Sequence, residues 1–347
     1  MSAGGAGLGV VSAGASAATG SAALLSGCAT TGGGKADKRF ARGEYETAIP
    51  LYKAQVAKGK TVPIANYRIG ESYRLSNRLE QAAPFYKAAL DSRVRNADAG
   101  FRYAEALRAD GKFDEAAAQF STYATSGANR TLAARAETEA KNTLASKALA
   151  GQASGYDVHP LDSLNSAASD FGATVKPDTK EFVFASGRDG KKYLGNGEKF
   201  TDLYAIKFND AAALTGGKVA PLAGPFNSPS RFEASATYTP DGKTVVFARS
   251  NDGSKKGYLS VDLWISYFKG GEWSTPILAN INDRTADDFA PAFAPDGVTL
   301  YFASSRRSGL GGNDLFKATL GPNGRFSPAE NLGDGINTAG NENFPGV

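Results

Sequence analysis

Three six-residue stretches at equal intervals decide the fold of the first half of this chain. They read GEYETA at residues 43–48, NRLEQA at residues 77–82 and GKFDEA at residues 111–116, so each begins 34 residues after the one before. An aromatic residue follows each stretch at the same interval: Tyr52, Tyr86 and Phe120. Because side chains four residues apart share one face of a helix, the Ala that ends each stretch should lie beside this aromatic residue. A fixed period of this length predicts stacked helix–turn–helix units.

The period and its small and aromatic positions resemble the tetratricopeptide repeat. In that pattern small residues stand where paired helices approach closely, and here they are Ala48, Ala82 and Ala116 in one position and Gly70 and Ala104 in another. The Ala-rich amphipathic stretch at residues 131–150 is predicted to be a capping helix. Residues 35–150 are therefore predicted to form three repeats and a cap, which is the usual minimum for a stable array.

Such arrays bind peptides or partner helices along the concave face made by the first helix of each pair. Projecting the repeat onto this chain places seven residues on that face: Asp37, Tyr67, Glu71, Arg74, Phe101, Glu105 and Arg108. Aromatic and Arg anchors would make this face a protein-binding groove. The alternative is that Glu71 with Arg74, and Glu105 with Arg108, are only surface pairs three residues apart on a helix.

A second repeat, of about 55 to 62 residues, occupies residues 155–347, where short runs rich in Val, Phe, Tyr and Thr alternate with Gly-rich turns. Each unit opens with an Asn (Asn165, Asn227, Asn282, Asn337), which an aromatic residue follows (Phe171, Phe232, Phe289, Phe344). A Pro-Asp turn comes next (177–179, 240–242, 295–297) and leads into a predicted strand (182–186, 245–249, 300–304). An Asp-Leu-aromatic stretch completes the unit (202–204, 262–264, 314–316). Pro-Asp-Gly favours a tight hairpin turn, because Pro restricts φ and Gly accepts a positive φ.

These units resemble the blades of TolB-type (PD40, WD40-like) β-propellers, so the fold class predicted for the whole chain is a multi-domain α plus all-β protein. A tetratricopeptide solenoid would be followed by a partial β-propeller. The first unit departs from the pattern, with Thr179 in place of Gly and an insertion at residues 187–199. Asp202, Asp262 and Asp314 are expected to hold the loop before their strand by side-chain-to-backbone bonds, and not to be catalytic.

Residues 341–347 align with residues 286–292, the start of a unit, so residues 155–347 are read as three blades plus the start of a fourth. Closed propellers usually have four to eight blades, and an open sector would leave blade faces uncovered. The expectation is that the chain is part of a longer protein.

The first 34 residues contain no Lys, Arg, Asp or Glu, and the run Leu24-Leu25-Ser26-Gly27-Cys28 resembles the lipobox of bacterial lipoproteins. That resemblance implies a signal peptide at residues 1–28, lipid attached to Cys28 and a flexible tether at residues 29–34. The alternative is a Gly/Ala-rich tail with an incidental cysteine. Ala29 in place of Asp after the cysteine favours the outer membrane by analogy, and the lack of an acidic cluster after Cys28 favours a lipoprotein that faces the periplasm.

The order of lipobox, tetratricopeptide repeats and TolB-type propeller resembles OmpA-family lipoproteins of Bacteroidota-type bacteria that serve the type IX secretion system. The resemblance implies a scaffold that contacts protein partners through the repeat groove and the propeller face, and the outer membrane through lipid. Peptidoglycan binding is implied only through a C-terminal domain that this sequence lacks. Two alternatives remain: the gating propeller of a serine peptidase whose catalytic domain lies further on, and a periplasmic sensor propeller.

Composition restricts the chemistry. One cysteine and one histidine, His159, exclude an internal disulfide and a Cys/His zinc site, and the sequence holds no Gly-x-Ser-x-Gly or P-loop motif. We therefore predict no enzyme activity, no catalytic or metal-binding residue and no cofactor. Residues 35–150 hold 20 Lys and Arg against 13 Asp and Glu, a surplus too interspersed with acids to indicate nucleic acid binding.

Overall fold

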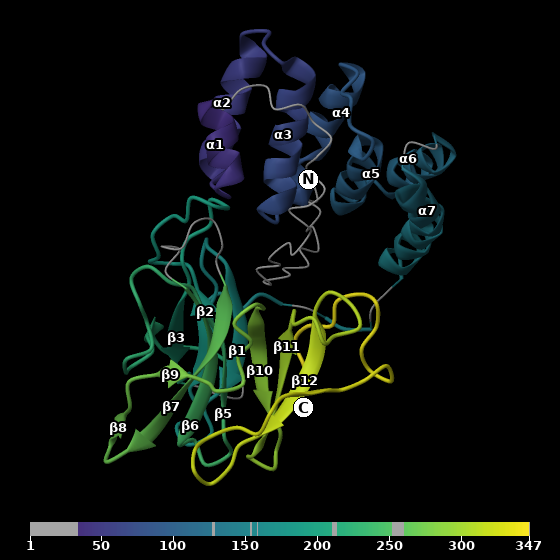
Figure 1. Cartoon of the computed structure of the whole chain (residues 1–347). Coiled ribbons are helices and arrows are strands. Elements are labelled where there is room, and N and C mark those ends of the chain that lie inside the picture. Colours follow the sequence, from purple (N-terminus) through teal and green to yellow (C-terminus); the bar gives the residue numbers. More distant parts are fainter. Residues whose placement is uncertain are drawn as a thin grey trace.

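The computed structural model describes residues 34–126, 129–152, 155–157, 159–209, 214–251 and 260–346. Its first part is helical, and its second part consists of antiparallel sheets (Figure 1). The helices are α1 (Lys35–Ala41), α2 (Tyr45–Ala57), α3 (Val62–Leu75), the 3₁₀ turn η1 (Leu79–Gln81), α4 (Ala83–Asp91), α5 (Ala99–Ala109), α6 (Phe113–Ser126) and α7 (Arg130–Ala150). They form three successive pairs and a longer last helix, as the 34-residue period predicted.

The turn inside each helical pair has the same backbone conformation. Gly43, Asn77 and Gly111, again 34 residues apart, have φ of 72°, 57° and 73°. In each turn the next residue donates its N–H to the carbonyl five residues back, and these bonds measure 3.0, 2.8 and 2.9 Å. This pattern is a Schellman-type helix end, which Gly favours and Asn tolerates because a left-handed conformation costs them little. The first residue of each quoted stretch is therefore the helix terminator.

The small and aromatic positions pack as the sequence predicted. Ala48, Ala82 and Ala116 have no exposed surface, and Tyr52, Tyr86 and Phe120 are buried. A Cβ atom added to Gly70 would lie 2.7 Å from the ring of Tyr86, so only Gly allows α3 and α4 to approach this closely. Asn129 caps α7 by accepting a hydrogen bond from Leu132 N at 3.3 Å, and α7 then covers the aromatic residues of the third pair.

The second part contains three antiparallel sheets in chain order. Sheet 1 is β1 (Asp170–Val175), β2 (Phe182–Ser186), β3 (Asp202–Ile206) and β4 (Ala220–Pro221). Sheet 2 is β5 (Glu233–Tyr238), β6 (Thr244–Ser250), β7 (Val261–Lys269) and β8 (Glu272–Trp273), with β9 (Ile277–Leu278) also paired to β7. Sheet 3 is β10 (Asp288–Phe293), β11 (Thr299–Ser304), β12 (Asp314–Thr319) and β13 (Glu330–Asn331). The three predicted units are thus three separate sheets.

The first strand of every sheet carries a β-bulge at the same place. The register shifts between Phe171 and Thr174 in β1, between Ala234 and Thr237 in β5, and between Phe289 and Ala292 in β10. The residue that follows the second position of each strand has a positive φ: Gly172 64°, Ser235 47° and Ala290 49°. A bulge bends and twists its strand, so the repeated bulge gives the three sheets one shape.

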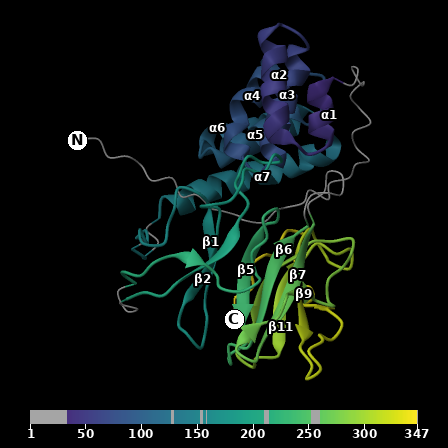
Figure 2. The same ribbon diagram turned by 90° about the vertical axis from the view of Figure 1, so that its left-hand side faces the viewer.

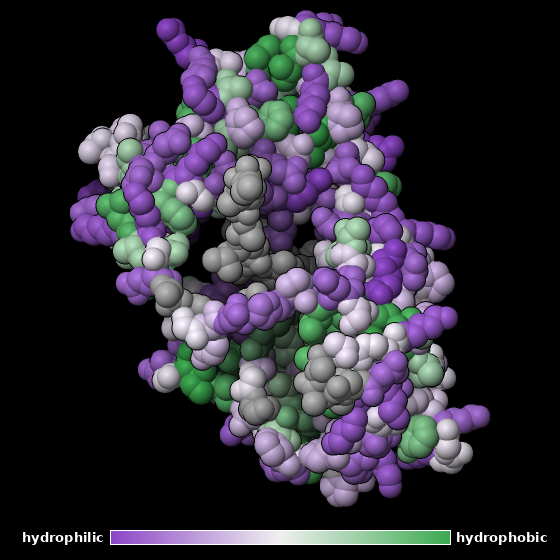
Figure 3. All heavy atoms as spheres, turned by 180° about the vertical axis from the view of Figure 1, so that it is seen from behind, coloured by the Kyte–Doolittle hydropathy of each residue, from purple (hydrophilic) through white to green (hydrophobic). Residues whose placement is uncertain are grey.

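Neighbouring sheets share cores made of their facing side chains. Val183 and Leu203 of sheet 1 pack with Tyr238 and Phe247 of sheet 2. Val246 and Ile265, on the other face of sheet 2, pack with Phe302 of sheet 3. The first strand of sheet 2, β5, contacts the first strands β1 and β10 of both other sheets, and Figure 2 shows β1 and β5 as neighbours. From behind, hydrophobic atoms gather over the sheets, while the helical part is mainly hydrophilic (Figure 3).

Residues 337–346 repeat the start of a unit, with a register one residue away from the predicted alignment. Thr338 N donates to Glu342 Oε2 at 2.9 Å, as Asp283 N does to Asp288 Oδ2 at 2.7 Å. Phe344 has φ 54°, which matches Ala290 and not Phe289. Glu342 therefore corresponds to the first residue of β10.

Candidate protein-binding surfaces

Glu71 is the centre of a buried polar network on α3. Arg74 donates to both its carboxylate oxygens, at 2.9 and 2.7 Å, and the Tyr86 hydroxyl donates to Oε1 at 2.6 Å. Burial would raise the pKa of Glu71, but the hydrogen bonds and charge of Arg74 hold it below its usual value. The predicted pair of Glu71 and Arg74 is present, and it belongs to the packing between α3 and α4 as much as to the surface.

The two predicted aromatic anchors lie in the helical core. Tyr67 is 7% exposed and packs on Tyr86 at 5.9 Å between ring centroids. Phe101 has no exposed surface and packs edge-on against Phe120 at 5.3 Å. The expectation that Phe101 offers its ring to a partner is therefore wrong for this conformation, because α7 covers it.

The capping helix also changes the ion pairs of α5. Glu105 accepts from Arg102 at 2.7 Å and lies 3.6 Å from Arg135 of α7, while Arg108 donates to Glu139 of α7 at 2.5 Å. The pair of Glu105 and Arg108 does not form, because Glu105 binds Arg102 of its own helix and Arg108 binds Glu139 of α7. The remaining predicted residue, Asp37, accepts from the Tyr52 hydroxyl at 2.7 Å.

We name the charged residues shared by α3, α5 and α7 the ion band: Glu71, Arg74, Arg102, Glu105, Arg108, Arg135 and Glu139. Its four Arg exceed its three Glu, and the side chains of Arg108 and Arg135 are 31% and 54% exposed. Partly exposed guanidinium groups can bind carboxylates of a partner in a bidentate manner. The role of this face in partner binding stays a prediction.

Each sheet contains a buried Arg–carboxylate pair that the sequence patterns did not reveal. Arg188 bonds Asp170 at 3.1 Å, Arg249 bonds Glu233 at 2.8 Å and Arg306 bonds Asp288 at 2.5 Å. In each case the Arg also donates to a backbone carbonyl and lies over an aromatic ring of its own sheet. Removing one partner of such a buried pair is strongly destabilising, so these pairs hold the sheets together and are not free to bind a ligand.

The recurring Asn closes the preceding sheet, whereas the order of the sequence landmarks predicts that it opens the next unit. Asn227 accepts from Leu203 N and donates to Leu203 O, Asn282 does the same with Leu263, and Asn337 with Leu315. These bonds measure 2.8 to 3.0 Å. The amide thus pairs with the backbone of the third strand as a neighbouring strand would.

The three Asp residues that begin third strands differ from one another. Asp314 accepts from Leu310 N at 3.1 Å and from Gly311 N at 3.3 Å, as predicted. Asp202 instead faces Glu233 of the next sheet, and burial raises the pKa of both carboxyls, that of Glu233 to about 8. Burial and the nearby Asp288 raise the pKa of Asp262 to about 6. Facing carboxyls thus recur at both boundaries between sheets.

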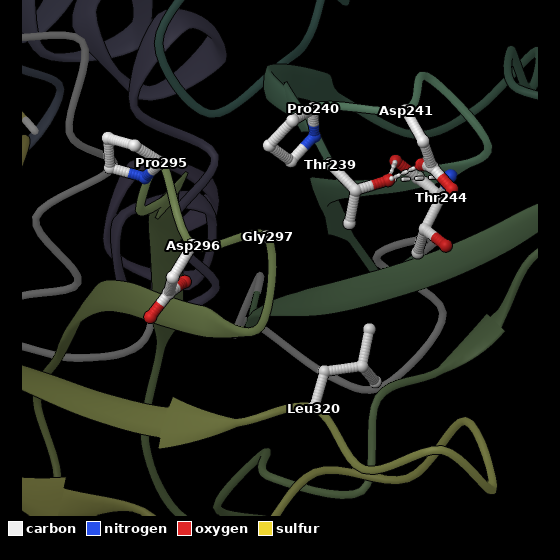
Figure 4. A pocket seen from close by; sticks show the side chains of 8 residues that line it. All are labelled: Thr239, Pro240, Asp241, Thr244, Pro295, Asp296, Gly297 and Leu320. Carbon is white, nitrogen blue, oxygen red and sulfur yellow. Dashed lines mark hydrogen bonds between the residues drawn. The ribbon is translucent and has the colours of Figure 1, made fainter.

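The Pro-Asp turns of neighbouring sheets stack on each other (Figure 4). A Cβ added to Gly242 would lie 3.1 Å from Asp178 Cγ, and one added to Gly297 would lie 2.9 Å from Pro240 Cδ. A cavity of about 380 Å³ lies between the second and third turns. Thr239 and Asp241 bond each other at 2.6 Å, so these polar groups of the cavity wall are already satisfied. We therefore assign a structural role to the Pro-Asp turns.

The insertion at residues 187–199 joins sheet 1 to the first helical repeat. Lys192 Nζ donates to Glu46 Oε1 at 2.6 Å, and Leu194 O accepts from Glu46 N at 3.2 Å. Arg78 donates to the other oxygen of Glu46 at 2.8 Å, which ties the loop to the second repeat as well. Tyr193 of the same loop packs on Phe232 of sheet 2 at 5.5 Å. We name residues 187–199 the docking loop.

Two predicted features remain, the lipidation site Cys28 and the single histidine His159. Cys28, the signal peptide and residues 29–33 of the tether lie outside the described residues. His159 is exposed, with Nε2 3.0 Å from Asp157 Oδ2. Within the described ranges, no group of three or more His, Cys, Asp or Glu could hold a metal ion. No helix in the described part of the chain is long and apolar enough to cross a bilayer.

Comparison with known proteins agrees with the helical geometry. Residues 34–93 and 67–131 match the family model of the tetratricopeptide repeat. The helical part is a tetratricopeptide-repeat array. None of the curated proteins matches the chain.

The chain is also similar to several solved structures at low identity. For a putative TolB from Agrobacterium tumefaciens, identity is 17% and TM-score 0.30, over 47% of this chain and 46% of that one. TolB from Acinetobacter baumannii is 17% identical with a TM-score of 0.28, and the match covers 48% of this chain and 33% of that one. A puromycin-hydrolyzing peptidase of Mycobacterium tuberculosis is 13% identical with a TM-score of 0.31, and the match covers 47% of this chain and 23% of that one. The chain spans less than half the length of each of these proteins.

Proposed function

We propose that this protein is a non-catalytic scaffold that binds protein partners through its tetratricopeptide-repeat array. The observation that carries the proposal is the ion band, which runs along the first helices of two repeats and onto the capping helix. Its partly exposed Arg side chains bond to carboxylates that are buried or half-buried, and these bonds restrain the band as well as charging it. A rigid surface loses little entropy when a partner binds.

We further propose that the three sheets are blades of a β-propeller that presents a second surface. Their common strand order, the bulge in each first strand and the stacked Pro-Asp turns support a radial arrangement. The docking loop contacts both the helices and sheet 2, which would hold the two surfaces in one orientation.

The proposed location is the periplasmic face of the outer membrane, with lipid on Cys28 as the anchor. The lipobox resemblance and the order of the domains support an OmpA-family lipoprotein similar to PorE of the type IX secretion system. Tethering to peptidoglycan would then belong to a domain outside this sequence. Radiolabelled palmitate should enter the wild type and not Cys28→Ser, and an unlabelled wild type would contradict the anchor.

Site-specific photocrosslinking tests partner binding. A benzoylphenylalanine at Arg108 or Arg135 of the ion band should give discrete crosslinked products in the native host. Lys141 is the matched control, because it is 77% exposed on α7 and pairs only with Glu137. Equal crosslinking from Lys141, or none from the band, would contradict the proposal.

A further inference from the structure

A groove of about 980 Å³ runs between sheets 1 and 2, apart from the helical array. One side is built by residues 207–209 after β3 and residues 217–225 around β4, and the other side by the β7–β8 hairpin. Figure 1 shows β3 and this hairpin on the same side of the sheet part. The volume lies near the upper end of the range for small-molecule pockets.

The β3 side of the groove is basic. Lys207 and Lys218 line it, and a Cβ on Gly217 would lie 2.4 Å from Lys207 O, so the two segments that carry these lysines are in contact. Among the described residues, neither lysine has a carboxylate within ion-pair distance. Both side chains are exposed, and their ammonium groups are available to a ligand.

The hairpin side of the groove is aromatic. Phe268 is 36% exposed and packs on Trp273 at 5.4 Å, while Phe226 and Tyr238 support Trp273 from behind at 5.4 and 6.1 Å. The indole is thus fixed in place and partly open to the groove. Lys176 Nζ, which also pairs with Asp178 Oδ2 at 3.4 Å, stands 5.9 Å from its centroid.

The groove also carries two acids. Glu181 accepts from the Thr179 hydroxyl at 2.8 Å, and Glu272 lies opposite Lys269 in the β7–β8 backbone pairing. With three lysines against these two acids, the lining keeps a net positive charge. The edge of sheet 1 is also closed to an added strand, because Pro221 of β4 has no N–H to donate. A ligand must therefore bind through its side chains.

We propose that this groove binds an extended segment of another protein in which acidic and apolar residues alternate. Successive side chains of an extended chain point to opposite sides. Such a segment places its carboxylates on Lys207 and Lys218 and its apolar side chains on Trp273 and Phe268. This surface goes beyond the helical-array function, and it can fail without affecting the crosslinking expected from the ion band.

Fluorescence anisotropy with a labelled eight-residue peptide of alternating Asp and Val tests the proposal on the whole chain. Binding should be saturable and should weaken at least tenfold in Lys207→Glu/Lys218→Glu. Trp273→Phe, which keeps an aromatic side chain, should weaken binding less than Trp273→Ala. Lys191→Glu/Lys243→Glu is the matched control, since both lysines are exposed and outside the groove lining, and it should bind as the wild type does.

Two further peptides and one hydrodynamic measurement complete the test. A peptide of the same composition with its acids in one block, and an alternating Lys-Val peptide, should bind at least tenfold more weakly. Equal binding of the block peptide, or no loss in the groove variant, overturns the proposal. Concentration-dependent dimers in analytical ultracentrifugation that disappear in Trp273→Ala would identify a second copy of this chain as the occupant and would also overturn it.

Discussion

Gly197 of the docking loop lies so close to Glu46 of α2 that an added Cβ would stand 2.7 Å from the carboxylate. The two residues belong to different parts of the chain, and Gly197 also has a φ of 83° that side chains rarely adopt. The positive φ therefore favours glycine here, and an added Cβ would also displace the end of the Glu46 side chain. This contact, with the bond from Lys192, is where the helical array and the sheets meet.

Gly197→Ala should detach the docking loop from α2. We expect faster amide hydrogen exchange at residues 187–199 and at the start of α2, with the rest of the helices unchanged. Gly333→Ala is the control, because Gly333 has a similar φ of 76° but no atom within 4 Å of an added Cβ. If both variants behave alike, backbone strain and not the contact with Glu46 controls the loop.

Arg306→Ala should destabilise sheet 3 by about 3 kcal/mol, since it leaves the buried Asp288 without its counter-charge. It also removes the cation over the Phe316 ring, at 4.7 Å. Chemical denaturation monitored by the near-UV signal measures the change. Lys87→Ala, which breaks an exposed pair with Asp91, should leave stability close to that of the wild type. A loss as small for Arg306→Ala would contradict the structural role of the pair.

Ser235→Gly should stabilise the sheets by about 1 kcal/mol, because Ser235 holds a φ of 47° at the bulge of β5. The equivalent residue of β1 is already Gly172. Thermal unfolding measures the gain, and Gly172→Ala should show the opposite sign. A destabilised Ser235→Gly would mean that the hydroxyl, and not the backbone, matters at this position.

Stability should fall as the pH rises through the titration of Asp262. Burial and then the charge of Asp288 raise the pKa of this carboxyl to about 6, above its value in the unfolded chain. The folded protein therefore holds a proton that the unfolded chain releases, so the contribution is complete below about pH 4 and lost above about pH 6. Asp262→Asn should reduce the pH dependence of the melting temperature between these two pH values. An unchanged pH dependence would mean that another group titrates in this range.

The repeats were predictable from the sequence because their signals are local. The Gly or Asn terminators, the small and aromatic positions and the Pro-Asp turns act within one turn or one hairpin. The Arg–carboxylate pairs were missed because their spacing is not constant: Arg249 occupies the strand position that Ser186 and Ser304 hold in the other sheets. The recurring Asn was assigned to the wrong unit because its partner lies in the strand before it.

The partner-binding groove of the helical array was the feature that the sequence predicted least well. Projection of the repeat placed Phe101 and Arg108 on an open face, but the projection cannot know where the capping helix will lie. In the structure α7 covers Phe101 and takes Arg108 as a partner for Glu139. The docking loop was visible in the sequence only as an insertion, since its contact with Glu46 spans 146 residues.

A two-surface scaffold requires the array and the sheets to keep one relative orientation. Double electron–electron resonance between spin labels at Lys87→Cys on α4 and Lys243→Cys beside β6, in a Cys28→Ser background, measures this orientation. Because the docking loop holds the two parts together, we expect one narrow distance distribution that broadens in Lys192→Glu. A broad distribution in the parent protein, unchanged by Lys192→Glu, would contradict this expectation.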